Sequence, residues 1–325
     1  MTAQEVTEGL RGPAFAATPW TYHQGHVVAY DSVGFTVATQ GLNYGTGVFE
    51  GIRAYWDPRA HSLHVVKLRE HLERFAASAR LLHLDLGATV AELSDASTEL
   101  LVRNGYRGDT YLRPIAHTLQ FLPGTAFGVR LRGISTATSI YALPMPAGIG
   151  IEGVRCLVSS WRRVPDESLP ARAKITGSYA NLALAVDEAT SAGCDDAILL
   201  NTKGTVAEAS TANVFLARDG QLITPHLGAD ILAGITRGCV IELAATEGDT
   251  VVEREVPRSE LYSADEIFLT GTGCELVPVI AIDGRSVGDG SVGPVTRRYL
   301  QRYRDAVHGR DDSLAGWLTT VRLTD

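Results

Sequence analysis

The sequence predicts an α+β protein built from two domains, and three observations support this. Strand-like and helical stretches follow one another without the regular alternation that a doubly wound parallel sheet requires. Residues 143–150, with two prolines and two glycines, divide the chain near its middle as a linker would. The length of 325 residues suits two domains of ordinary size.

The first half is expected to form a sheet with helices packed against it. Pro13 and Pro19 lie among small residues in the first 20 positions, which indicates a loose N-terminal arm over 1–20. Helical spacing of apolar residues predicts two helices, at 69–84 and 89–105. A small N-terminal domain is therefore expected over residues 21–142. Its strand patterns, bounded by turn signals, lie at 22–30, 34–40, 48–56, 62–68, 110–121 and 136–144.

The second half, after the linker at 143–150, is expected to form a larger domain over residues 151–325. The dipeptides Asp219-Gly220 and Asp283-Gly284 predict tight hairpins. An irregular, proline-containing loop over 162–174 runs into the first helix. The expected strands are 153–161, 196–201, 213–220, 221–225, 251–256, 265–273 and 275–287, and the expected helices are 178–193, 234–247 and 295–307.

Composition excludes several classes of protein. Lys and Arg number 29 and Asp and Glu 37, so the formal charge is −8, which argues against nucleic acid as a partner. No apolar run approaches the roughly 18–20 residues of a membrane span. The N-terminus also lacks the basic and apolar regions of a signal peptide. Four widely spaced cysteines without a CxxC pattern indicate no disulfide scaffold and favour a cytoplasmic location.

Two histidine pairs have the spacing of metal ligands, His23 with His26 and His61 with His64. Both pairs lie in strand-like stretches, and neither has a matching acidic or thiol partner nearby. Histidine alone at such spacing is a weak indication of a zinc site. No metal is therefore expected.

Lysine is rare in this chain, with only Lys67, Lys174 and Lys203 among 29 basic residues. A coding bias toward arginine explains the average, but arginine replaces lysine poorly where an amine must deprotonate. Lys174 lies where the proline-containing loop meets an apolar helix, and Tyr179 follows five residues later. An amine at such a position can be partly desolvated, which lowers its pKa. Spacing alone still favours a structural lysine over a catalytic one.

Eight segments carry a resemblance to a known family. In chain order they are NYGTGVFEGIRAY (43–55), KLREHLERF (67–75), TYLRP (110–114), SSWRR (159–163), AKITGSYANLALA (173–185), VAEASTANVF (206–215), LAGITR (232–237) and DEIFLTGTGCELVPV (265–279). Their order and spacing resemble those of the branched-chain aminotransferases, class IV aminotransferases of pyridoxal phosphate fold type IV. The resemblance implies a small N-terminal α/β domain, a larger C-terminal pseudo-barrel domain and pyridoxal 5'-phosphate as cofactor.

The resemblance also implies roles at the ring end of the cofactor. Lys174 matches the Schiff-base lysine, which also moves a proton during the reaction. Glu208 matches the acid facing the pyridine nitrogen, where a carboxylate keeps the nitrogen protonated and the ring an electron sink. Tyr179 matches the hydroxyl donor at the phenolic oxygen, and Leu232 the residue packed against the ring.

At the phosphate end, Arg69 matches the phosphate-binding arginine, whose guanidinium fork suits a dianion. Ile235 and Thr236 open a helix whose backbone N–H groups and dipole favour an anion. Thr272 adds a hydroxyl.

The substrate residues implied by the resemblance fall into two groups. Tyr111 and the turn Gly271–Gly273, including Thr272, form the α-carboxylate site. The second group binds the distal carboxylate and forms the pocket wall: Arg113 with Tyr44 close by, then Phe49, Gly51, Arg53 and Tyr179.

The implied activity is a two-stage, ping-pong transfer of an amino group from L-branched-chain amino acids to 2-oxoglutarate, in a homodimer or a larger homo-oligomer. The chain departs from the family pattern after the pyridine acid, where Ala209 and Ala212 replace Gly and Glu. It departs again in its GTG turn and in a linker without aromatic residues. Three alternatives therefore stay open: a D-amino acid or (R)-amine transaminase, a lyase similar to aminodeoxychorismate lyase, and a binding protein without activity.

Overall fold

The structure is a computed structural model that describes residues 18–119, 129–146 and 152–323. The chain divides into two compact units, residues 1–146 with 307–325, and residues 147–306. Most of the expected N-terminal arm (1–20) and half of the expected linker (143–150) lie outside the described residues. No helix in these described ranges combines the length and apolar character needed to cross a membrane.

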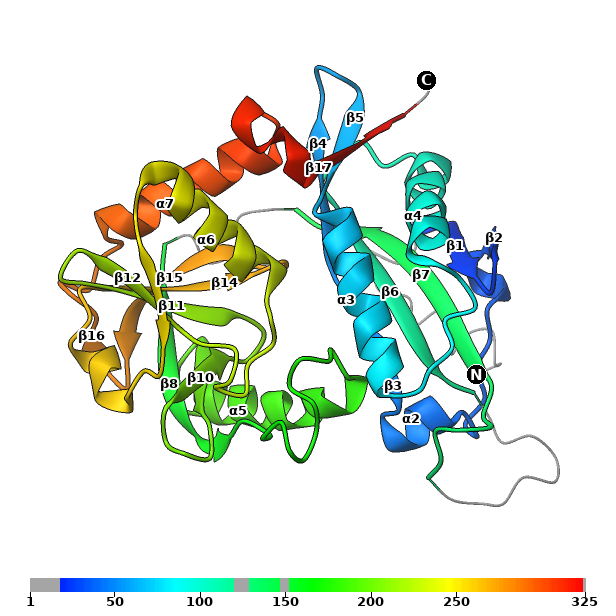
Figure 1. The fold of residues 1–325 in the computed structure, drawn as a ribbon. Helices are drawn as coiled ribbons and strands as arrows, with labels where there is room; N and C mark the ends of the chain where they lie inside the picture. Colours follow the sequence, from blue (N-terminus) through cyan, green and yellow to red (C-terminus); the bar gives the residue numbers. More distant parts are fainter. Residues whose placement is uncertain (1–17, 120–128, 147–151, 324–325) are drawn as a thin grey trace. The chain divides into compact units, whose positions relative to one another are not determined.

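The first unit contains one antiparallel sheet with helices against it (Figure 1). The strands pair in the order β17-β5-β4-β6-β7-β1-β2, and β3 also pairs with β6. Its strands are β1 (Trp20–His23), β2 (His26–Ala29), β3 (Gly47–Phe49), β4 (Ile52–Asp57), β5 (Ser62–Val66), β6 (Thr110–Thr118), β7 (Thr136–Pro144) and β17 (Leu318–Arg322). Its helices are η2 (Tyr30–Ser32), α2 (Gln40–Tyr44), α3 (Leu68–Leu81), α4 (Val90–Asn104) and η5 (Asp312–Trp317).

Local sequence explains where the long helices of this unit begin and end. Thr89 and Glu92 form a reciprocal capping box at the start of α4, and Gly105 ends it with φ of 65°. α3 begins after Lys67 and turns Leu72 and Phe75 into the core. α3 contacts α4 and β3, whereas α4 contacts β1, β7 and β17. Both predicted helices are confirmed.

The expected strand at 48–56 is broken in the structure. Glu50 and Gly51 separate β3 from β4, although both strands pair with β6. Glu50 turns its side chain into a buried cluster, and a Cβ on Gly51 would lie 1.8 Å from the hydroxyl of Tyr111. Glu50 and Gly51 therefore interrupt the strand, although the pattern of apolar residues over 48–56 predicts that it continues.

Another expectation for this unit is wrong. Residues 34–40 contain no strand: they form a loop that leads into α2, with Phe35 and Val37 56% and 88% exposed. β-branched and aromatic residues favour strands only where a partner strand and a covered face exist.

The C-terminal segment belongs to the first unit. β17 pairs antiparallel with β5, from Leu318 opposite Val66 to Arg322 opposite Ser62. The second unit thus ends at residue 306, whereas the large domain is expected over 151–325. Polar residues occupy alternate positions of this terminal strand. Such a pattern shows which face of the strand is solvated but gives little indication of the sheet that the strand joins.

The second unit is a sheet that curls back on itself. Its strands pair in the order β10-β9-β8-β15-β14-β11-β12-β13, with β16 added beside β15. They are β8 (Val154–Arg162), β9 (Asp196–Leu200), β10 (Val206–Ala209), β11 (Asn213–Arg218), β12 (Gln221–Pro225), β13 (Val251–Arg254), β14 (Glu266–Gly271), β15 (Glu275–Ile282) and β16 (Arg285–Ser286). The helices are η3 (Thr176–Ser178), α5 (Tyr179–Ser191), α6 (Ile235–Glu247), η4 (Arg258–Tyr262) and α7 (Pro294–Val307).

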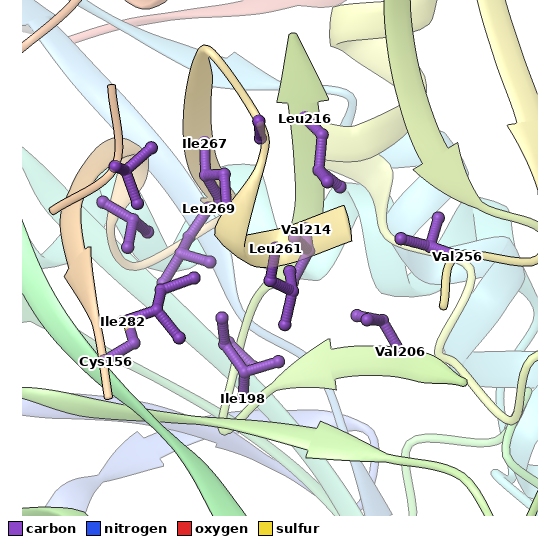
Figure 2. Close-up of a cluster of buried hydrophobic side chains, with 14 of the residues drawn as sticks. Cys156, Ile198, Val206, Val214, Leu216, Val256, Leu261, Ile267, Leu269 and Ile282 are labelled. Carbon is purple, nitrogen blue, oxygen red and sulfur yellow. The ribbon is translucent and has the colours of Figure 1, made fainter. Parts of the chain in front are cut away.

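The two ends of this strand order meet beyond β13. Val206 N, at the start of β10, donates to Val256 O at 2.8 Å, and Thr205 forms a β-bridge with Pro257. Apolar side chains from most of the strands fill the interior, and Figure 2 shows Ile198, Val214 and others converging there. The sheet closes around one core, as the expected pseudo-barrel requires.

Hairpins and helices of this unit follow the sequence closely. Asp219-Gly220 and Asp283-Gly284 adopt positive φ at both positions, as type I′ turns require. The helices expected at 178–193, 234–247 and 295–307 appear as α5, α6 and α7. α5 lies against β8 and β9 through a second apolar cluster. β10 was not predicted from the sequence, because all four of its residues are buried and show no alternation of apolar and polar side chains.

Candidate active site

Lys174 and Tyr179 form the first contact of the site in the second unit. Lys174 Nζ donates to Tyr179 Oη at 2.7 Å, and its ammonium lies 5.4 Å from the centroid of the tyrosine ring. The loop before Lys174 is held by hydrogen bonds, among them Ala171 N to Asp166 Oδ1 at 2.8 Å. Tyr179 begins α5, so its position is fixed by a helix. A half-buried amine at a phenol is the arrangement that the sequence predicts.

Glu208 is a buried carboxylate on β10 with partners from three segments. Arg163 Nε, just beyond β8, donates to Oε1 at 2.8 Å. Asn213 Nδ2 and Leu232 N both donate to Oε2, each at 3.1 Å. In the described part of the chain Oε2 thus accepts two hydrogen bonds and Oε1 one. Oε1 therefore retains more capacity to accept a further donor.

Burial and the neighbouring positive charges shift the pKa of Glu208 in opposite directions. Burial raises the pKa of Glu208 above its usual range, and the positive charges of Arg163 and Lys174 offset part of that shift. This electrostatic link also relates Lys174 to Glu208. The structure therefore brings the lysine, the tyrosine and the carboxylate of the sequence prediction into one site.

The loop from Leu232 to Gly234 connects this carboxylate to the start of α6. The Leu232 N–H donates to Glu208 Oε2 at 3.1 Å. The Leu232 carbonyl oxygen accepts from Asn213 Nδ2 at 3.0 Å. Gly234 is the N-cap of α6 and has no side chain to cap the helix, so the N–H groups of Ile235 and Thr236 lack that partner. An uncapped helix N-terminus favours an anion.

The turn at Gly271–Gly273 packs against the segment that follows Glu208. A Cβ on Gly271 would lie 3.1 Å from Thr211 O and 3.4 Å from the Cβ of Ala212. Thr272 is partly exposed within this turn. Thr270, which precedes it on β14, is buried, and its hydroxyl has no hydrogen-bond partner among the described residues. Thr270 lies opposite Asn213 in the sheet, which relates the turn to the Glu208 cluster.

These groups fit a phosphorylated pyridine aldehyde by their chemistry. Lys174 offers the amine, Glu208 a partner for a ring nitrogen, and Tyr179 a phenol donor. The start of α6 offers N–H groups to a phosphate, and close approach at Gly234 shapes that end: a Cβ there would lie 1.9 Å from Asn213 Oδ1. The donor set and this tight cradle agree with the cofactor that the sequence resemblance implies.

Substrate candidates of the first unit gather around Arg113. Its guanidinium carbon lies 4.6 Å from the centroid of the Phe49 ring and 5.2 Å from that of Tyr111. Arg113 Nη2 donates to Tyr111 Oη at 3.1 Å. Its Nε is buried and has no hydrogen-bond partner among the described residues. Burial raises the pKa of Tyr111, and Arg113 offsets part of this shift.

Two further predicted substrate residues of this unit lie at different distances from that cluster. Gly51 belongs to it, because the Tyr111 hydroxyl occupies the space where a side chain at position 51 would begin. Tyr44 is the last residue of α2, a helix that contacts β6.

Two further predicted residues, Arg53 and Arg69, make the following contacts within the first unit. Arg53 is 1% exposed and donates to Met145 O at 3.1 Å, so it joins β4 to the end of β7. The Arg69 side chain is 82% exposed and pairs with Glu73 at 2.8 Å. An exposed i,i+4 pair is typical of a solvated helix face.

Arg74 on α3 is partly buried and forms an ion pair that was not predicted from the sequence. Arg74 donates to both oxygens of Glu50, at 2.6 and 2.8 Å, and His71 lies 2.8 Å from the same carboxylate. Burial alone would raise the pKa of Glu50, but Arg74 and His71 hold it far below its usual range. The helical spacing was available as a signal: Arg74 follows His71 by three residues, next to Phe75 on the buried face.

Comparisons with known proteins identify the family. A family model described as amino-transferase class IV matches residues 47–282. A curated relative from Aquifex aeolicus, named a probable branched-chain-amino-acid aminotransferase, is 40% identical over 306 residues. That alignment covers 93% of this chain and 96% of the relative.

Solved structures give the same result. The branched-chain aminotransferase from Thermoproteus uzoniensis, crystallised with norvaline, is 41% identical with a TM-score of 0.88. The match covers 94% of this chain and 99% of the other. A T.th. branched-chain amino acid aminotransferase, in complex with N-(5'-phosphopyridoxyl)-L-glutamate, is 39% identical with a TM-score of 0.87. This second match covers 93% of this chain and 98% of the other.

Proposed function

Because the chain belongs to the class IV aminotransferases, we propose that it transfers the amino group of L-branched-chain amino acids to 2-oxoglutarate with pyridoxal 5'-phosphate as cofactor. The observation that carries this proposal is the cluster of Lys174, Tyr179 and Glu208, in which an amine, a phenol and a charge-compensated buried carboxylate share one site. The cofactor supplies the aldehyde and the electron-accepting ring when bound.

Each residue of the cluster has a separate task. Lys174 would hold the aldehyde and would move the substrate proton, since a primary amine can act as both nucleophile and base. Tyr179 Oη, 2.7 Å from Nζ, orients the amine and would offer a proton to a phenolic oxygen. Glu208 would keep the ring nitrogen protonated, and its Oε1 is the oxygen with fewer donors.

The phosphate end belongs to the start of α6. The N–H groups of Ile235 and Thr236 face an anion at the positive end of the helix dipole. Thr272 and the orphaned hydroxyl of Thr270 lie on the adjoining strand and turn. Leu232, held at both its N–H and its carbonyl, packs its side chain against the ring.

Arg113 supports a dicarboxylate as the amino acceptor. Its buried Nε without a hydrogen-bond partner among the described residues is costly to leave unpaired, by about 1–3 kcal/mol, and a carboxylate oxygen satisfies it. Phe49 beside it offers an apolar surface for a branched side chain. One relative was crystallised with norvaline, which has an apolar side chain, and another with a phosphopyridoxyl-glutamate adduct, which has an acidic one. These two complexes support the proposed pair of substrates.

A panel of amino donors tests the proposal. The purified enzyme is mixed with L-leucine, L-isoleucine, L-valine, D-alanine and an (R)-amine, and the conversion of bound cofactor to its amine form is followed by absorbance. We expect conversion with the three L-amino acids and its reversal by 2-oxoglutarate. Turnover of the D-amino acid or of the (R)-amine alone would contradict the proposal, as would pyruvate release without any acceptor.

A lysine variant tests the assigned nucleophile. Lys174→Ala is expected to abolish turnover and to prevent borohydride from fixing the cofactor to the protein, while Lys203→Ala keeps both. Lys203 is a suitable control, because its side chain is 71% exposed beside Glu255. A Lys174→Ala enzyme with unchanged turnover would remove the basis of the mechanism.

Assembly and location are part of the same proposal. A homodimer or larger homo-oligomer is supported by Phe35, Val37 and Leu42, three large apolar side chains exposed within eight residues of the first unit. Light scattering on the wild type and on Val37→Asp tests it, with a monomeric wild type as the contrary result. A cytoplasmic location is supported by four free cysteines and is tested by cell fractionation.

A further inference from the structure

We propose that Asn213 is a positioning residue that ties the acid at the ring nitrogen to the loop that opens α6, so that both ends of the cofactor are held by one hydrogen-bonded frame. The inference rests on the proposed function. Asn213 is the first residue of β11, is 4% exposed, and touches neither Lys174 nor Tyr179 among the contacts that the structure records. Its role is therefore exerted through Glu208 and Leu232.

The side-chain amide of Asn213 uses both of its N–H hydrogens. Nδ2 donates to Glu208 Oε2 at 3.1 Å and to Leu232 O at 3.0 Å. Leu232 N donates to the same Oε2 at 3.1 Å. Glu208, Asn213 and Leu232 thus form a closed triangle of three hydrogen bonds. Because each member is bound to the other two, neither the carboxylate nor the loop can shift alone.

The oxygen of the same amide determines how the chain enters α6. Gly234, the N-cap residue, has φ of −65°, which any residue adopts, so glycine is needed there for space. A Cβ at this position would lie 1.9 Å from Asn213 Oδ1. Asn213 is therefore packed against the backbone from which the N–H groups of Ile235 and Thr236 project. Displacing the amide would move both the Glu208 oxygen and the helix start.

Only an amide side chain combines two N–H donors, for Glu208 and Leu232, with an oxygen packed against Gly234. Aspartate has the same shape but no N–H, and it would place a second carboxylate beside Oε2, where two like charges cannot both ionise cheaply. Alanine removes the donors and leaves Oε2 with the Leu232 N–H alone. The groups that face Glu208 and set its charge are Arg163 and Lys174.

The experiment measures pyridoxal phosphate binding to the apoenzyme of the wild type, Asn213→Ala and Asn213→Asp. We expect Asn213→Ala to weaken binding about tenfold or more, which equals 1.4 kcal/mol. Asn213→Asp should bind almost as the wild type at acid pH, where the two carboxyls share a proton and the aspartic O–H replaces the amide donor. Its affinity should fall relative to the wild type as the pH rises and that proton is lost.

Asn201→Asp is the matched control. Asn201 is a 2% exposed asparagine in the same barrel, with hydrogen bonds to Thr205 and Lys203 and none to Glu208. A buried aspartate there lowers thermal stability without changing the pH dependence of cofactor affinity. If Asn201→Asp and Asn213→Asp give the same pH dependence, the effect is a general result of a buried charge and the inference is wrong.

A double-mutant cycle separates positioning from loss of stability. Gly234→Ala should weaken cofactor binding in the wild type, because its Cβ meets Oδ1, and should weaken it far less in the Asn213→Ala background. Additive effects would overturn the inference. A wild type that takes up no pyridoxal phosphate would overturn the proposed function itself. A wild type that binds it, with Asn213→Ala equal in affinity, would overturn this inference alone.

Discussion

Gly51→Ala provides a steric test of the substrate site. The new Cβ would lie 1.8 Å from the hydroxyl oxygen of Tyr111 and 2.6 Å from its Cζ. A normal carbon–oxygen contact is about 3.3 Å, so the hydroxyl must retreat by roughly 1.5 Å. Arg113 Nη2 is 3.1 Å from that hydroxyl, and a retreat of this size breaks the hydrogen bond. The substitution therefore disturbs Tyr111 and Arg113 without removing a functional group.

The expected magnitude follows from overpacking. Inserting a methyl group into a filled site costs about 1–3 kcal/mol, which corresponds to roughly a 5- to 150-fold loss in kcat/KM if the strain is relieved by moving Tyr111. The loss should be larger for 2-oxoglutarate than for L-leucine, because Arg113 is assigned to the distal carboxylate. Tyr111→Phe in the same chain should recover part of it, since the hydroxyl contact disappears while the Cζ contact at 2.6 Å stays.

Steady-state kinetics with both substrates and a thermal melt measure these effects. Gly108→Ala is the control, because a Cβ at Gly108 meets nothing within 4 Å. If Gly51→Ala keeps kcat/KM for 2-oxoglutarate within about twofold of the control, Tyr111 does not bind substrate as proposed. An equal loss for both substrates would instead remove Arg113 from its assigned role.

Three further predictions concern charged residues. Glu208→Gln should lower kcat by at least about a hundredfold and blue-shift the bound cofactor, measured by kinetics and absorbance, because a neutral amide no longer holds the ring proton. The folded-state pKa of Glu50 is lowered, so its stabilisation is present above about pH 4.3 and is lost as pH falls below that value. Thermal melts should show this acid sensitivity in the wild type and much less of it in Glu50→Gln. Arg74→Ala should lose about 3–5 kcal/mol of unfolding free energy in urea titrations, because Glu50 stays buried, whereas Arg69→Ala should change it far less, because its ion pair with Glu73 lies at the surface.

The sequence predicted most of the fold because its periodic segments and turns are locally determined. α4 has a capping box, the Asp-Gly turns adopt the φ values that only a few residues tolerate, and α5 and α6 carry apolar faces. It failed where the outcome depends on distant partners. Residues 34–40 have strand-like composition but form no strand in the structure, and β17, which begins at Leu318, pairs with a strand that ends at Val66.

The candidate site shows the same division. Lys174, Tyr179 and Glu208 were found through a motif, and the structure places them together. The ion pair between Arg74 and Glu50 could not be predicted from a motif, because the two residues are 24 positions apart and only the packing of α3 brings them together.

Two buried carboxylates, Glu50 and Glu208, show how structure distinguishes a structural anion from a functional one. Glu50 receives two charged hydrogen bonds from Arg74 and a contact with His71, and its pKa falls although it is fully buried. Glu208 receives one bond from Arg163 and two from neutral amides, and its pKa rises. Glu50 is thus compensated by its own unit and has no need of a further cation.

Glu208 is compensated only in part. The part of the cost of burying its charge that remains uncompensated is offset by any group that brings a proton with partial positive charge to Oε1. A protonated pyridine nitrogen is such a group. Binding of that group should therefore lower the pKa of Glu208 and strengthen the triangle with Asn213 and Leu232. Under the proposed function, this incomplete compensation, rather than burial by itself, is what a protonated ring nitrogen would complete.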